Sequence, residues 1–118
     1  MYGLPLDTDL RFLVGSVLTQ VCIGENEALL NFEPETSIMV AASARTVSET
    51  AGVEVHEDAP GLGRRAVDRL GDSVVDYGVL VGGVLELRFA SGSTIELFDT
   101  WPNYESYTIT HQDTVIVV

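Results

Sequence analysis

Apolar and polar residues alternate along two stretches of the chain, residues 15–40 and 71–97. Leu85, Leu87 and Phe89 fall on one side of an extended segment while the residues between them are charged, which is the pattern of a strand with one buried face. Turn residues separate the alternating runs. The pattern predicts six strands in two groups of three: Ser16–Ile23, Glu27–Phe32 and Ser37–Ala42, then Ser73–Val81, Val84–Phe89 and Thr94–Phe98.

The two groups of strands resemble each other. Ala28 matches Leu85 at an offset of 57 residues, the same offset holds as far as Val40, and a one-residue slip is needed only at the leading glycines. A chain of 118 residues has the usual size of one domain. We therefore expect one domain over residues 1–118 with an internal duplication at about 15–40 and 71–97.

The rest of the chain is less regular. Residues 41–70 are expected to connect the two copies, with a short strand at Val53–His56 and two helical turns at Arg64–Leu70. Residues 101–118 predict a C-terminal hairpin that turns at Gln112-Asp113. Because Val115–Val118 is apolar on both faces, we expect it inside a sheet or in a homodimer interface.

These elements predict a mostly β fold. Each copy should form a three-stranded antiparallel meander, and the two meanders should pack as a sandwich or roll, with the C-terminal hairpin and one short helix added. The apolar positions that face inward define the expected core: Val17, Leu30, Phe32, Ile38, Leu85, Leu87, Phe89 and Ile95.

The charge is strongly acidic, since 18 acids stand against six arginines and no lysine, for a net charge of −12. Such a balance disfavours binding to nucleic acid, and it favours a basic protein partner where it does more than keep the chain in solution. Cys22 is the only cysteine and is expected to be a half-buried strand residue. No apolar run is long enough for a membrane span, and we expect a cytoplasmic protein without membrane contact.

One segment near the C-terminus is rich in aromatic and polar side chains. Large aromatics of this kind dominate the centres of protein interfaces and line ligand pockets. The alternative is structural, with the tryptophan closing one end of the core and a tyrosine hydroxyl bonding to a loop. The candidate binding residues are Trp101, Asn103, Tyr104, Glu105, Ser106 and Tyr107.

Patterns that suggest catalysis or cofactors are weaker. Ser106, His111 and Asp113 have the residue types of a catalytic triad, but nearby strand positions do not converge without a bend. The segment 56–58 with His111 offers metal ligands without a recognised spacing, and residues 61–66 match a dinucleotide-binding glycine pattern without the strand that should precede it. We assign no catalytic residue, no metal ligand and no cofactor.

Three motifs resemble a known family. Leu4-Pro5-Leu6, the run from Gln20 to Gly24, and Asn103-Tyr104-Glu105-Ser106 within residues 102–109 resemble a family of small bacterial proteins catalogued as a domain of unknown function, marked by a C-terminal Asn-Tyr-Glu-Ser motif. The resemblance implies a bacterial origin and the order of the strands, and it assigns no catalytic residue.

Size, acidity and the aromatic segment favour a non-enzymatic protein-interaction module, in its sharpest form an immunity-type inhibitor of a basic toxin. The alternative is a small-molecule-binding β domain that uses the segment from Trp101 to Tyr107. A small hydrolase is less favoured than either.

Overall fold

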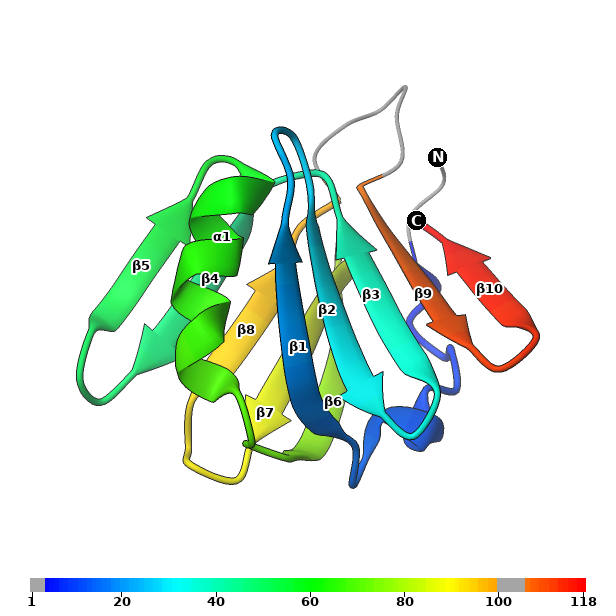
Figure 1. Cartoon of the computed structure of the whole chain (residues 1–118). Helices are drawn as coiled ribbons and strands as arrows, with labels where there is room; N and C mark the ends of the chain where they lie inside the picture. Colours follow the sequence, from blue (N-terminus) through cyan, green and yellow to red (C-terminus); the bar gives the residue numbers. More distant parts are fainter. Residues whose placement is uncertain (1–3, 100–105) are drawn as a thin grey trace.

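The chain folds into two five-stranded antiparallel sheets that lie face to face, as the computed structural model shows for residues 4–99 and 106–118 (Figure 1). The first sheet has the order β1 (Val17–Ile23), β2 (Ala28–Glu33), β3 (Thr36–Val40), β9 (Tyr107–His111) and β10 (Thr114–Val117). The second sheet has the order β5 (Gly52–His56), β4 (Ala44–Ser48), β8 (Thr94–Leu97), β7 (Val84–Phe89) and β6 (Val74–Leu80). The predicted mostly β sandwich is confirmed.

The two halves of the chain exchange a hairpin. The β4–β5 hairpin follows β3 in the chain but pairs with β8 of the second sheet. The β9–β10 hairpin follows β8 but pairs with β3 of the first sheet. Each sheet therefore takes three strands from one half and two from the other, and residues 41–70 hold a complete hairpin where we expected a single short strand.

Equivalent backbone hydrogen bonds join the two halves where each meander begins. The Gly15 N–H donates to the Val74 carbonyl at 2.7 Å, and the Gly71 N–H donates to the Leu18 carbonyl at 2.8 Å. Gly15 and Gly71 have φ angles of +90° and +82°, a region that L side chains rarely adopt. The two contacts are the same contact at an offset of 56 residues, so the meanders meet in an approximately two-fold arrangement.

The core lies between the sheets and is built from the inward residues of both meanders. Leu30 and Leu87 are both fully buried, as the alternation predicts. The prediction that Val17 belongs to the core is wrong. Val17 is partly exposed because it pairs with Glu33 on the outer face of the sheet. Its neighbour Leu18, which lies opposite Phe32, is the buried residue. The other buried strand residues include Ile38, Val40, Val74, Leu85, Phe89, Ile95, Leu97 and Ile109.

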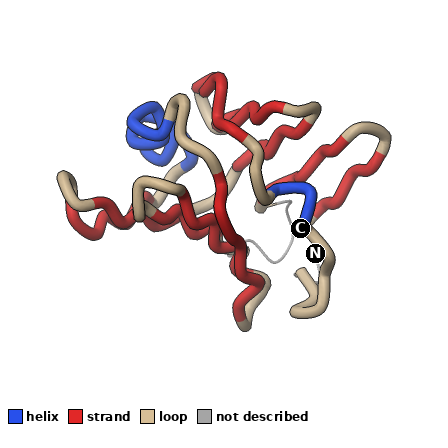
Figure 2. The backbone as a smooth tube through the Cα atoms, turned by 90° about the horizontal axis from the view of Figure 1, so that it is seen from below, coloured by secondary structure: helices blue, strands red, loops and turns tan. Residues whose placement is uncertain are grey.

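Helix α1 (Ala59–Ala66) begins five residues earlier than the predicted helical turns, and the short 3₁₀ helix η2 (Val67–Arg69) follows it. It starts at Ala59 because Asp58 caps it, accepting a hydrogen bond from the Gly61 N–H at 2.8 Å, and because proline suits a first helical turn. The helix contacts β1 and β2 of the first sheet and β4 of the second. Figures 1 and 2 show it beside the strands, covering one open side of the sandwich.

A second 3₁₀ helix, η1 (Arg11–Leu13), precedes β1 and contacts β6. Among the described residues, no helix is long and apolar enough to cross a membrane.

Candidate functional site

The predicted aromatic site lies largely outside the described residues, because Trp101, Asn103, Tyr104 and Glu105 fall in the gap at residues 100–105. The other two members are buried. The Ser106 hydroxyl donates a hydrogen bond to Asp99 Oδ1 at 2.9 Å, and the Tyr107 hydroxyl donates to the Gly83 carbonyl at 2.6 Å. Burial raises the pKa of Tyr107. Ser106 and Tyr107 therefore make hydrogen bonds inside the protein. Binding by the segment as a whole stays a prediction.

The segment coincides with the place where the second half of the chain is longer than the first. The Ala41 N–H donates to the Ser106 carbonyl at 2.9 Å, and the Phe98 N–H donates to the Ser43 carbonyl at 3.1 Å. These equivalent bonds bracket two residue steps from Ala41 to Ser43 but eight from Phe98 to Ser106, a difference of 8 − 2 = 6 residues. The aromatic segment is thus an addition at one of the two points where the chain crosses between sheets.

The outer face of the first sheet carries two rows of uncharged side chains, one residue from each strand. Opposite residues of an antiparallel pair share a face, and the register therefore places these side chains together. Met39 on the central strand is 44% exposed, and Val115 on the edge strand is 59% exposed. Both rows therefore present apolar side chains to solvent. We call this surface the neutral face; its members are Gln20, Asn31, Ser37, Thr110 and Val115 in one row, and Cys22, Leu29, Met39, Thr108 and Val117 in the other.

Carboxylates lie at both ends of the neutral face. Glu25 and Glu27 belong to the connection between β1 and β2, Glu33 and Glu35 flank the turn between β2 and β3, and Asp113 lies in the turn between β9 and β10. All five are exposed, and none forms an ion pair among the described residues. We call these five residues the acidic rim.

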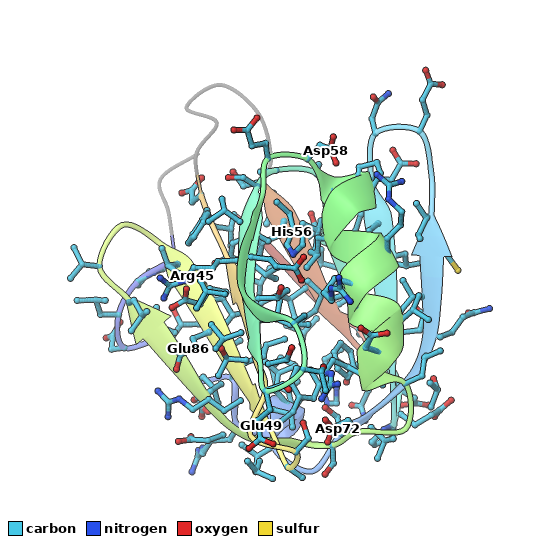
Figure 3. The ribbon with its side chains drawn as sticks, turned by 90° about the vertical axis from the view of Figure 1, so that its left-hand side faces the viewer. Arg45, Glu49, His56, Asp58, Asp72 and Glu86 are labelled. Atoms are coloured by element: carbon cyan, nitrogen blue, oxygen red, sulfur yellow. The ribbon has the colours of Figure 1, made fainter. Side chains whose placement is uncertain are left out.

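The outer face of the second sheet differs because its charges neutralise one another. Arg45 pairs with Glu96 on the neighbouring strand, and Arg88 contacts both Glu86 and Asp76. The Glu96 carboxylate raises the pKa of Arg45, and Figure 3 shows Arg45 and Glu86 on this side of the molecule. Five of the six arginines are paired in this way across the described residues, and none of these pairs includes a carboxylate of the acidic rim.

An open cleft of about 390 Å³ lies between α1 and β5, lined by Glu54, His56, Gly61, Arg64 and Arg65. His56 Nε2 lies 2.9 Å from the Thr46 hydroxyl oxygen, and burial lowers the pKa of His56. Arg65 Nε is 2.6 Å from a Glu54 carboxylate oxygen. The cleft therefore holds a histidine whose pKa is lowered by burial and an arginine that is paired with acidic side chains.

The two histidines are not brought together. His111 lies in the first sheet, where its Nδ1 is 2.8 Å from the Thr36 hydroxyl oxygen and its ring stacks on Phe12, whereas His56 lies in the second sheet. In residues 4–99 and 106–118 there is no group of three histidine, cysteine or acidic side chains that could hold a metal ion. The suggested metal site is therefore not assembled from these residues.

The remaining sequence candidates also separate. Ser106 bonds to Asp99 while His111 stacks on Phe12, so the triad pattern corresponds to no relay. Residues 61–66 are inside α1, so Gly61 and Gly63 do not form the turn between strand and helix that the dinucleotide pattern requires. Cys22 is exposed rather than half-buried, because it lies opposite Leu29 on the neutral face of an edge strand.

Comparison of the chain with protein-family models, with curated proteins and with solved structures finds no match. The fold is a mostly β sandwich of two five-stranded antiparallel sheets. The resemblance to the bacterial family with the Asn-Tyr-Glu-Ser motif stays a prediction.

Proposed function

We propose that this protein is a non-enzymatic interaction module that binds a basic protein partner through the neutral face and the acidic rim. One observation carries the proposal: on a chain with a net charge of −12, a five-stranded sheet presents two full rows of uncharged side chains, with unpaired carboxylates only at its ends.

This arrangement has the chemical layout of a protein interface. Interface centres are depleted in charge and use methionine and other apolar residues, while their rims are polar. Met39 and Leu29 lie opposite each other near the middle of the face, where their burial against a partner would remove apolar surface from water. Rim carboxylates contribute mainly by attracting a partner of opposite charge and orienting it.

The partner that fits is a protein with a basic border around an apolar patch. Inhibition of a basic toxin is one form of this function, and it is supported by the size and acidity of the chain. Such an inhibitor needs no catalytic group of its own, only a surface that covers the site of the toxin.

The test is affinity capture from an extract of cells that produce the protein, with quantitative mass spectrometry of what is retained. The variant is Met39→Asp, which places a charge at the centre of the neutral face. The matched control is Val53→Asp, because Val53 is an exposed valine on the outer face of the second sheet. Both variants add the same charge to the same kind of exposed strand position.

We expect the wild type and Val53→Asp to retain a basic protein that Met39→Asp does not retain. Retention should also fall in about 1 M salt, where the Debye length shrinks to about 3 Å. Equal capture by the wild type and Met39→Asp, or capture that does not respond to salt, would show that this surface is not the binding site.

A further inference from the structure

Within residues 4–99 and 106–118, strand β10 pairs with a neighbour along only one of its two edges, because it is the last strand of the first sheet. The Val118 N–H donates to the Tyr107 carbonyl at 2.9 Å, which makes that pair a hydrogen-bonded one. Bonded and non-bonded pairs alternate along an antiparallel ladder, so Ile116 directs its N–H and carbonyl toward β9. Val115 and Val117 consequently direct theirs away from the sheet, toward the free edge.

The side chains of the two outward-bonding residues are also open. Val115 is 59% exposed and Val117 38% exposed on the neutral face, while Ile116 packs toward the core. A free edge that is flat, apolar and uncharged is the type of strand that pairs with another strand. All four residues from Thr114 to Val117 are uncharged.

The other sheet edges are covered or charged. β1 and β6 are joined to each other by the bridge between Val17 and Ser73 and by backbone bonds near it, and they contact α1 and η1 respectively. β5 has exposed valines at equivalent positions, Val53 and Val55, but Glu54 lies between them. Glutamate beside the bonding positions protects an edge against pairing, and β10 has no such residue.

We propose that two copies of this chain associate through β10, in an antiparallel pair about a two-fold axis. Val115 of one copy then lies opposite Val117 of the other and exchanges two backbone hydrogen bonds with it, and the second such pair is related by symmetry. The axis passes between the two copies of Ile116. The two first sheets become one continuous sheet, and their neutral faces become one surface with the valines at its centre.

A second copy is the occupant that the strand itself favours, because Thr114–Val117 is uncharged and can pair with its own copy about a two-fold axis. Each copy has a net charge of −12, so two copies repel one another over most approaches. Antiparallel pairing at β10 brings only uncharged strand residues into contact, and it places the Asp113 carboxylates of the two copies at opposite ends of the pair. A two-fold contact is also closed, so it forms a dimer and stops there.

The predicted salt dependence has the opposite sign from that of the proposed partner binding. Salt screens the repulsion between two acidic copies and leaves backbone hydrogen bonds and apolar contacts in place, so dimerisation should strengthen as salt rises. The contact is small, and small interfaces are weak. It should therefore be measured from about 10 µM to about 1 mM, the range of weak dissociation constants.

The experiment is analytical ultracentrifugation of the full chain at low and high salt, with two variants of β10 and one control. Val117→Pro removes an N–H that faces the free edge and is not used in pairing with β9. Val115→Glu places a charge on a residue whose backbone N–H and carbonyl face the free edge. The control is Val53→Glu, which introduces the same charge on β5. Circular dichroism establishes that each variant is folded.

The wild type and Val53→Glu should dimerise, and salt should tighten both dimers. Val115→Glu should raise the dissociation constant at least about tenfold, or 1.4 kcal/mol, and Val117→Pro should do the same. If Val117→Pro does not fold, Val115→Glu decides the question alone. A wild type that is monomeric at the highest concentration in high salt, or a dimer unaffected by Val115→Glu, would overturn the proposal. Neither result depends on the partner tested with Met39→Asp.

Discussion

Replacing Gly63 by alanine tests how closely α1 approaches the first sheet. An added Cβ would lie 2.8 Å from Ile23 Cγ1 and 3.2 Å from Ala28 Cβ, both closer than ordinary van der Waals contact. Ile23 is 43% exposed and can turn away. Ala28 is fully buried and its Cβ moves only with the backbone of β2, so the helix or the strand must shift.

Two effects of opposite sign set the magnitude. Overpacking a tight contact costs about 1–3 kcal/mol, whereas glycine to alanine inside a helix gains about 1 kcal/mol from helix propensity. Because one of the two close contacts cannot yield, the packing cost should dominate. We expect the free energy of unfolding to fall by about 1 kcal/mol, which for a domain of this size lowers the melting temperature by about 4 °C.

The assay is urea denaturation followed by circular dichroism, with an unchanged m-value as evidence that the same surface unfolds. The matched control is Gly61→Ala in the same helix. Its Cβ would come within 3.1 Å of Asp58 Oδ1, at the end of a movable side chain, and then 3.7 Å from His56 Cβ. This control should be neutral or slightly stabilising.

A second background separates the two contacts. Because Ile23 can turn away whereas Ala28 cannot, the cost of adding the Cβ at position 63 should be nearly the same in an Ile23→Ala background, as a double-mutant cycle would show. If Gly63→Ala proves as stable as the wild type while Gly61→Ala does not, then close approach does not explain the glycine at this position.

Two further predictions concern buried polar groups. Tyr107→Phe leaves the Gly83 carbonyl without its donor and should lower the free energy of unfolding by about 1–2 kcal/mol; an unchanged denaturation midpoint would contradict the bond. The native pKa of His56 lies below its ordinary value of 6.5 because of burial, so unfolded chains take up a proton first as the pH falls through that value. The contribution of His56 to stability is thus complete above about pH 6.5 and is lost below it, and the stability advantage of the wild type over His56→Gln should shrink between about pH 8 and pH 5. An advantage that stays constant over this range would refute the assignment.

Alternation alone was enough to predict the two meanders, because each has one buried face of large apolar residues. It failed for β4, whose inward residues are Ala44 and Thr46. These are small or polar, so the run from Ala44 to Ser48 shows no apolar alternation. Ala44 and Thr46 are nevertheless buried, and α1 packs against the strand.

The predicted start of the helix, at Arg64 instead of Ala59, was wrong for a related reason. Pro60, Gly61 and Gly63 are poor helix residues by propensity, and they favoured a loop. The structure uses each of them: proline in the first turn, Gly61 as the donor to the Asp58 cap, and Gly63 for close packing on β1 and β2. The packing of the helix on the sheet overrides the low helix propensity of these residues. Because this packing depends on residues distant in the sequence, the local pattern does not predict it.

The neutral face could not be predicted from the sequence because each strand contributes only alternate residues to it. Its members come from residues 20–39 and 108–117, and the second group joins the first only through the exchange of hairpins. The strand order is the missing information. Once it is known, the absence of charge from two complete rows becomes visible.

The exchange of hairpins also makes the stability of each half depend on the other. Each half contains the outer hairpin of the sheet that the other half begins, so neither stretch of chain can complete a sheet from its own strands. Loosening one half removes strands from both layers at once, and the layers should therefore open together rather than one after the other. Fragments cut between the halves would have to find each other again before either could regain its full set of strands.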